Sequence, residues 1–183
     1  MKRSKKIVLL GHCILNVNSK VEGLAQYENN SLELLEYLIE NKFGIIQLPC
    51  PEAGFYGMRR WGHVKEQFDT PYYREYSRKI FYPILQQVED YINNGYEIKC
   101  IIGIDGSPSC GVSFTCSSKE WKGDFINKEE TLKKIGNIKY CNEKGIFMEE
   151  IDKMLKEKDI NIPIISINEV EKISLEKIKN FYK

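Results

Sequence analysis

The chain has little that would direct it to a membrane or to nucleic acid. Its 183 residues carry a formal net charge of +1, which gives no bulk attraction to polyanions. No apolar run approaches the roughly 20 residues of a membrane-spanning helix. The basic residues 1–6 are followed only by the apolar residues 7–10, which is shorter than the core of about 7–15 apolar residues in a secretory signal. We therefore expect a cytoplasmic protein with no membrane or nucleic-acid partner.

Two familiar motifs are also missing. No Cys-x-x-Cys pair occurs, which argues against zinc ribbons and thioredoxin-type redox sites. The segment Gly103–Gly106 lacks the glycine patterns of phosphate-binding loops, so no nucleotide cofactor is predicted. In a reducing compartment we expect no structural disulfides. The cysteines that remain to be explained are Cys13, Cys50, Cys100, Cys110, Cys116 and Cys141.

The composition is that of an ordinary globular domain. Apolar residues make up 42% of the chain and charged residues 29%. We predict one domain over residues 1–183, large enough to bury a core. Strands are predicted over residues 5–10, 44–48, 100–104 and 162–167, and helices over about 31–41, 71–94, 147–156 and after Ser174. This alternation predicts an α/β fold with a mainly parallel sheet of about four or five strands and helices on both faces.

Some finer features follow from the same patterns. Residues 51–70 and 114–138 are predicted to be long irregular loops, which often bind ligands. Thr70 and Pro71 are predicted to open a helix, and Pro83 to kink or break it. Pro163 points to an edge strand. The buried stripe of the helix is predicted to consist of Tyr72, Tyr76, Ile80, Ile84 and Val88.

Three cysteines each follow the end of a predicted strand. They are Cys13, Cys50 and Cys110. Because parallel strands end at one edge of their sheet, where ligands bind in such folds, these cysteines are predicted to converge there. Soft thiolates that converge select iron–sulfur clusters, zinc or copper(I). The other three cysteines are interpreted as small buried hydrophobes.

The number of ligands bears on the choice of metal. Structural zinc takes four ligands, and a 4Fe–4S cluster usually takes four cysteines. With three cysteines, one iron keeps an open position. His12 or His63 could instead complete a zinc site of three cysteines and one histidine, and this alternative stays open.

Two residues beside the cysteines are candidates for catalysis. Glu52, two residues after Cys50, could be a general acid or base, or simply a surface or helix-capping carboxylate. Ser107 could hold a water or a polar atom of a substrate, or it could stabilise its own loop as a serine turn. Asp105 is expected to order that loop. Arg59, Arg60 and His63 could line a pocket or face solvent.

Three motifs together resemble those of the thiouracil desulfidase (TudS) family. They are Gly11–Leu15, Cys50–Gly54 and Ser107–Gly111, within residues 5–125. The resemblance implies that Cys13, Cys50 and Cys110 hold a 4Fe–4S cluster with one free iron, which captures the sulfur of a thiolated substrate. It also implies that Glu52 and Ser107 assist.

The resemblance therefore implies a non-redox desulfidase that removes sulfur from a small, thiouracil-like thiolated compound. Residues 16–23 and 53–60, which would lie near the substrate, differ from the family pattern and leave its identity open. Other functions stay open as well: a non-catalytic iron–sulfur or zinc module for sulfide storage, sensing or partner binding, and a hydrolase with a cysteine nucleophile. The sequence also leaves a homodimer open.

Overall fold

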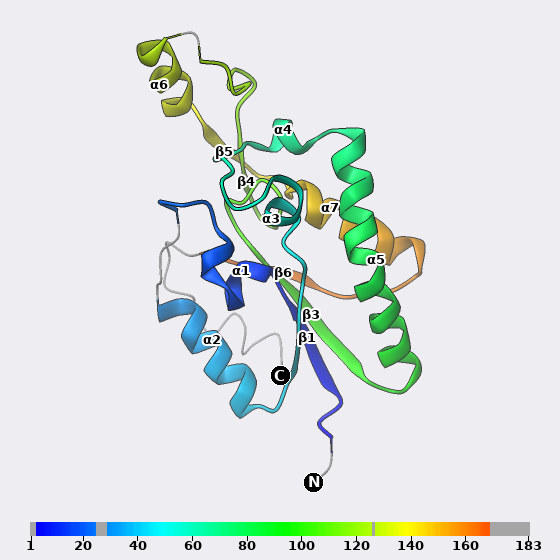
Figure 1. Cartoon of the computed structure of the whole chain (residues 1–183). Coiled ribbons are helices and arrows are strands. Elements are labelled where there is room, and N and C mark those ends of the chain that lie inside the picture. Colours follow the sequence, from blue (N-terminus) through cyan, green and yellow to red (C-terminus); the bar gives the residue numbers. More distant parts are fainter. Residues whose placement is uncertain (1–2, 25–28, 126, 169–183) are drawn as a thin grey trace.

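The computed structural model describes residues 3–24, 29–125 and 127–168, and it contains a parallel sheet of four strands. The strands are β1 (Lys6–Leu10), β2 (Gly44–Gln47), β3 (Glu97–Ile104) and β6 (Ile164–Ile167), in the order β2-β1-β3-β6 (Figure 1). Every pairing in this sheet is parallel. The predicted α/β fold is confirmed, and the strand after Pro163 lies at an edge as predicted.

Helices cover both faces of the sheet. Alternate residues of β1 point to opposite sides, so that Val8 and Leu10 pack with α2 (Asn29–Glu40), whereas Leu9 packs with α5 (Pro71–Asn93) and α7 (Ile146–Glu157). Burial on both sides explains why these strands are continuous runs of Ile, Val and Leu. Cys100, in the middle of β3, is fully buried in the core, as its interpretation as a small hydrophobe requires.

Helix α5 begins as predicted but buries a different stripe. Thr70 Oγ1 accepts a hydrogen bond from the Tyr73 N–H at 3.2 Å, with Pro71 in the first turn. The helix runs through Pro83 without a break; this proline lies on the exposed side, where water can satisfy the freed carbonyl. The predicted stripe is wrong at Tyr72, which is exposed, and only partly right at Ile80 and Ile84, which are half-buried against the core, because the fully buried stripe lies one residue further on. It consists of Tyr73, Ser77, Phe81, Leu85 and Val88.

The two segments predicted to be irregular contain short elements. Residues 51–70 form α3 (Pro51–Tyr56) and α4 (Lys65–Phe68), and residues 114–138 include β4 (Thr115–Ser117) and α6 (Lys128–Gly136). β4 pairs antiparallel with β5 (Lys139–Cys141), and α6 projects from the body beyond this pair (Figure 1). Elements of three to nine residues are too short for the sequence periodicity to reveal them. The short α1 (His12–Leu15) and the 3-10 turn Val17–Ser19 follow β1.

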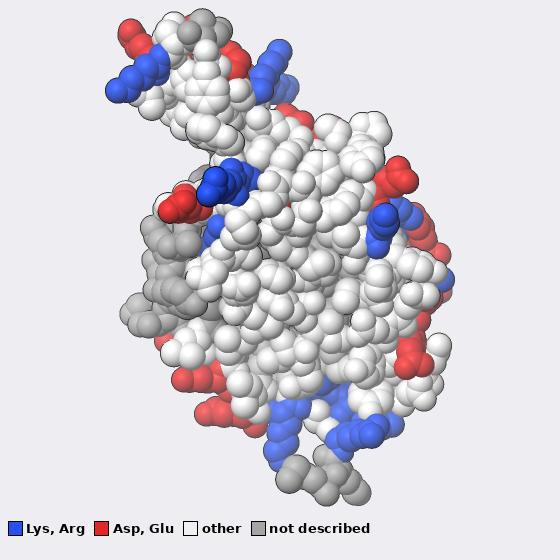
Figure 2. Space-filling view, in the orientation of Figure 1, with Lys and Arg blue, Asp and Glu red and all other residues white. Residues whose placement is uncertain are grey.

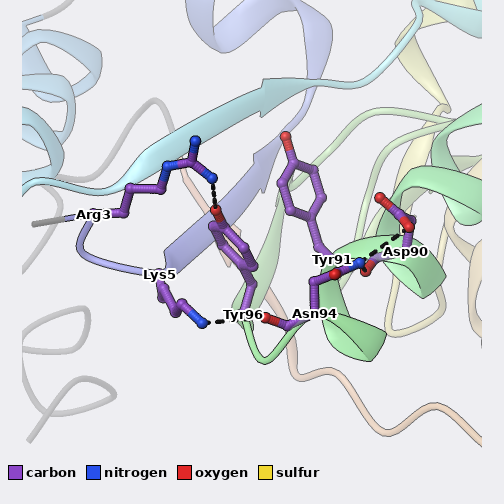
Figure 3. Close-up of a pocket in the computed structure, with 6 residues that line it drawn as sticks. All are labelled: Arg3, Lys5, Asp90, Tyr91, Asn94 and Tyr96. Atoms are coloured by element: carbon purple, nitrogen blue, oxygen red, sulfur yellow. Dashed lines mark hydrogen bonds between the residues drawn. The ribbon is translucent and has the colours of Figure 1, made fainter.

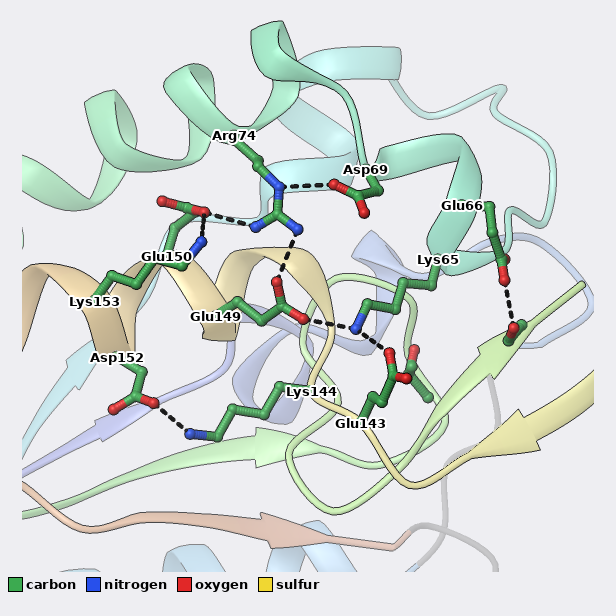
Figure 4. Close-up of polar contacts among 12 residues, drawn as sticks. Lys65, Glu66, Asp69, Arg74, Glu143, Lys144, Glu149, Glu150, Asp152 and Lys153 are labelled. Carbon is green, nitrogen blue, oxygen red and sulfur yellow. Dashed lines mark hydrogen bonds and ion pairs between the residues drawn. The ribbon is translucent and has the colours of Figure 1, made fainter. Parts of the chain in front are cut away.

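A network of ion pairs fixes α4 and the start of α5 against α7 (Figure 4). Lys65, which is largely buried, contacts Glu143 at 2.7 Å and Glu149 at 2.6 Å. Arg74 contacts Glu149 at 2.8 Å and Glu150 at 2.7 Å. The network therefore holds the first turn of α5 in place. The helix predicted after Ser174 and the side chains proposed as the cap of α2 lie outside the described residues.

No helix in the described ranges combines the length and the apolar character needed to cross a membrane.

Candidate functional site

The cysteines that follow β1, β2 and β3 lie at the carboxyl edge of the sheet. Cys13 is carried by α1, Cys50 caps the N-terminus of α3, and Cys110 lies in the loop after β3 (Figure 1). Because β2, β1 and β3 are adjacent in the sheet, these three loops are neighbours. The fold therefore places the three segments that carry these cysteines next to one another at one edge.

Electrostatic coupling reflects this proximity. Burial raises the pKa of Cys110 well above the usual value, and the neighbouring Cys13 and Cys50, followed by Glu52, raise it further. Cys110 is 8% exposed. Burial also raises the pKa of Cys50, although its Sγ accepts a hydrogen bond from the Ala53 N–H at 3.3 Å. Over residues 3–24, 29–125 and 127–168, no three His, Cys, Asp or Glu side chains are arranged as ready-made metal ligands.

The loop that carries Cys110 is shaped by its own side chains. Ser107 Oγ accepts hydrogen bonds from the N–H groups of Cys110 at 3.0 Å and Ser109 at 3.3 Å. Asp105 Oδ1 accepts from two further N–H groups, those of residues 112 and 113, at 3.1 and 2.8 Å. Both side chains thus order the turn, the structural alternative considered for Ser107 and the role expected of Asp105.

Both carboxylate oxygens of Glu52 have polar partners. Its Oε1 atom accepts hydrogen bonds from Ser109 Oγ at 2.6 Å and from Ser107 Oγ at 3.4 Å. Its Oε2 atom contacts Arg60 Nε at 3.2 Å, and the Arg60 side chain is 3% exposed. Arg60 also donates to the carbonyls of Gly57 and of Ser19, at 3.3 and 2.5 Å. Arg60 therefore orients Glu52 and ties α3 to the loop after α1.

The sequence did not decide whether Arg60 lines a pocket or faces solvent, and it did not single out Ser109 or Tyr73. The pair Arg59-Arg60 gives no sign of which member is buried, and the structure exposes Arg59. Ser109, 1% exposed, could have been suspected because it adjoins Cys110. Tyr73 is also 1% exposed, and its hydroxyl has no hydrogen-bond partner among the described residues. No sequence signal marks Tyr73, since the stripe predicted for α5 turned it toward solvent.

Both histidines have other contacts. His12 Nδ1 is 3.1 Å from the Leu48 carbonyl, to which it can donate, and its Nε2 is 3.5 Å from the Asn16 amide nitrogen. The His63 ring stacks on Tyr56 with centroids 4.6 Å apart. Burial lowers the pKa of His63, which makes the ring neutral at pH 7. His63 Nδ1 is buried without a hydrogen-bond partner among the described residues, so a zinc site that includes His63 stays an open alternative.

A separate cavity lies at the opposite edge of the sheet (Figure 3). It has a volume of about 400 Å³ and is formed where the chain enters β1 and β3. Its lining residues are Arg3, Lys5, Asp90, Tyr91, Asn94 and Tyr96. The cysteines follow the ends of their strands, so this cavity is not part of their site.

Charged side chains on the face that carries α3 and α5 gather along its rim, and the middle of this face is largely uncharged (Figure 2). Such a surface offers little electrostatic attraction to a highly charged ligand.

The fold and the site define an α/β protein with cysteines grouped at the carboxyl edge of a parallel sheet. A protein of Methanocaldococcus jannaschii named "Uncharacterized protein MJ0003" is 35% identical over 159 residues, which cover 87% of this chain and 92% of that protein. The chain belongs to the same family as this archaeal protein. No family model and no solved structure matches the chain.

Proposed function

We propose that the protein is an iron–sulfur-dependent desulfidase that hydrolytically removes sulfur from a small thiolated compound. The proposal is supported chiefly by the grouping of Cys13, Cys50 and Cys110 beside the hydrogen-bonded Glu52. The resemblance of the three cysteine motifs to thiouracil desulfidases adds to it. We also propose a cytoplasmic location, which suits an oxygen-sensitive cluster.

The donor set fits a 4Fe–4S cluster with three protein ligands. Thiolates are the ligands of such clusters, and three neighbouring loops each supply one: Cys13, Cys50 and Cys110. The Ala53 N–H group that donates to Cys50 Sγ is of the kind that tunes a sulfur ligand. When bound, the cluster supplies an iron with an open position, a Lewis acid with affinity for sulfur.

The surrounding residues supply the proton chemistry. Replacing a thiocarbonyl sulfur by oxygen consumes one water and releases hydrogen sulfide, with no change in oxidation state. Glu52 accepts the proton of the attacking water on its carboxylate, whose Oε2 atom is oriented by Arg60. Ser109, 2.6 Å from Oε1, keeps that atom in position. Glu52 later returns the proton to the departing sulfur.

Ser107 contributes through its loop. Its hydroxyl accepts from the Cys110 N–H, so it fixes the backbone of one proposed ligand, and at 3.4 Å it also reaches Glu52. Ser107 thereby links the position of Cys110 to that of Glu52. The Ser107 hydroxyl can also hold a water or a polar atom of the substrate.

Sulfide release from a panel of thiocarbonyl heterocycles that includes 2-thiouracil tests the proposal. The protein is purified and reconstituted with iron and sulfide without oxygen. Glu52→Gln should keep the wild-type iron content but lose turnover by about 10²–10⁴-fold, the usual contribution of a general acid or base. Cys110→Ala should lose both, and Cys100→Ala, in the core of β3, should lose neither.

Two results would contradict the proposal. A Glu52→Gln protein as active as wild type would remove the proton-transfer role. A wild-type protein that holds a cluster or zinc and turns over none of the thiolated compounds would favour the non-catalytic module.

A further inference from the structure

Tyr73 is a buried tyrosine whose position is fixed by three elements. Its N–H group donates to Thr70 at the start of α5. Its ring stacks on Phe68 of α4, with centroids 4.5 Å apart and planes 13° apart. The edge of Phe55 from α3 meets the same ring at 5.2 Å and 73°. The direction of the phenol is therefore set before any ligand arrives.

The hydroxyl at the end of this ring is buried, yet no atom in the described part of the chain meets hydrogen-bond geometry with it. The Ser109 hydroxyl lies near enough to lower the pKa of Tyr73 slightly, but it is outside hydrogen-bond geometry with the phenol, and its own hydrogen is donated to Glu52 at 2.6 Å. Buried polar groups are nearly always paired, and an unpaired one reduces the stability of the fold. Such an exception is typical of a group that meets its partner on a ligand.

The Tyr73 ring packs against an element of the cysteine site, because Phe55, whose edge meets it, lies on α3, the helix that Cys50 caps and that carries Glu52. Burial raises the pKa of Tyr73 far above its usual range, and the charges of Glu52, Cys110 and Cys50 add to the effect in that order. The phenol is thus protonated and able to donate in the physiological range. The groups that act on it are those of the cysteine site.

We propose that the Tyr73 hydroxyl is a substrate-binding donor, which donates its hydrogen bond to an acceptor atom of the thiolated substrate beside Cys50 and Cys110. The inference rests on the proposed function and narrows the substrate class. The substrate carries, near its thiocarbonyl carbon, an oxygen, sulfur or unprotonated ring nitrogen with a free lone pair. A fixed donor of this kind selects against analogues that lack the acceptor.

Tyr73→Phe separates this role from a structural one. In the protein without cluster or substrate, the variant should melt at the same temperature as wild type or higher, because only an unpaired hydroxyl is removed. After reconstitution its iron content should be unchanged. Its kcat/KM should fall about 10-fold, mostly through KM, as expected for a lost hydrogen bond in binding. The rise in melting temperature on adding substrate should shrink accordingly.

Tyr91→Phe is the matched control, since Tyr91 lies on the same helix but lines the cavity at the opposite edge of the sheet. It should leave kcat/KM and the substrate-induced shift unchanged. A Tyr73→Phe protein as active as an active wild type would overturn the role of Tyr73 alone. A large fall in its melting temperature without cluster or substrate would show a structural role instead. A wild type that turns over no thiolated compound would overturn the proposed function and this role together.

Discussion

Gly103 is the residue of β3 against which the Cys110 loop packs, and its replacement by alanine should disturb both the fold and the site. A Cβ atom at Gly103 would stand 2.5 Å from the Cys110 carbonyl oxygen and 2.6 Å from a methyl carbon of Val112. It would also lie 3.0 Å from the end of Met148. The first contact is with backbone, which cannot rotate away, so Gly103→Ala must displace the loop.

The cost can be worked from these contacts. Overpacking of a tight interior costs about 1–3 kcal/mol. The displaced Cys110 carbonyl also loses the hydrogen bond that it accepts from the Ile104 N–H at 3.0 Å. That bond contributes about 1 kcal/mol, for a total of about 2–4 kcal/mol. Because about 1 kcal/mol shifts the melting temperature of a chain of this size by about 2–4 °C, the expected fall is on the order of 5–15 °C.

Thermal unfolding followed by circular dichroism measures this effect, and iron content after reconstitution shows whether Cys110 has moved. Gly11→Ala is the control, because its Cβ atom would meet the Ile102 carbonyl at an ordinary 3.4 Å and its φ of −50° suits alanine. A Gly103→Ala protein that is as stable as Gly11→Ala and binds as much iron would contradict the predicted displacement of the Cys110 loop.

Two further predictions concern buried carboxylates. Burial of Glu150 favours its neutral form, but hydrogen bonds from Lys153 and Arg74 outweigh this and lower its pKa. Its stabilisation is therefore present above the unfolded-state pKa of about 4.3 and is lost as pH falls through the lower folded-state value. Glu150→Gln should melt below wild type at pH 7, with the gap closing toward pH 3 in a series of melting curves; a gap independent of pH would contradict this. Arg60→Gln should cost about 1.5–3 kcal/mol in urea unfolding, because Glu52 loses its charged hydrogen-bond donor. The double variant Arg60→Gln/Glu52→Gln should recover part of that lost stability. If the effects of the two substitutions are strictly additive, Arg60 and Glu52 do not stabilise each other.

The sheet could be predicted from the sequence because its strands are buried on both sides. Runs such as Ile7–Leu10 and Ile101–Ile104 then consist almost entirely of apolar residues and stand out in the sequence. The start of α5 was also readable, since Thr70 and Pro71 act locally through the cap and the fixed φ of proline. The three cysteines could be predicted to lie at the carboxyl edge because each one follows the end of a strand in a parallel sheet.

The features that could not be predicted from the sequence depend on tertiary packing. The two possible stripes of α5 have the same spacing, and only contacts with α7 and the sheet choose the one that contains Tyr73 and Phe81. The burial of Arg60 depends on its meeting Glu52 and the carbonyl of Ser19, 41 positions away. Short elements such as α3 and β4 lack the length for a periodic pattern. These same contacts build the surroundings of the cysteines.

The most direct test of the central claim is the iron and acid-labile sulfide content of the protein reconstituted without oxygen. We expect about four irons and four sulfides per chain in wild type, as in a cubane cluster. Cys110→Ala should lose both, whereas Cys100→Ala, in the core and outside the site, should retain them. One tightly held zinc without labile sulfide, or an unchanged cluster in Cys110→Ala, would contradict a 4Fe–4S cluster held by Cys13, Cys50 and Cys110.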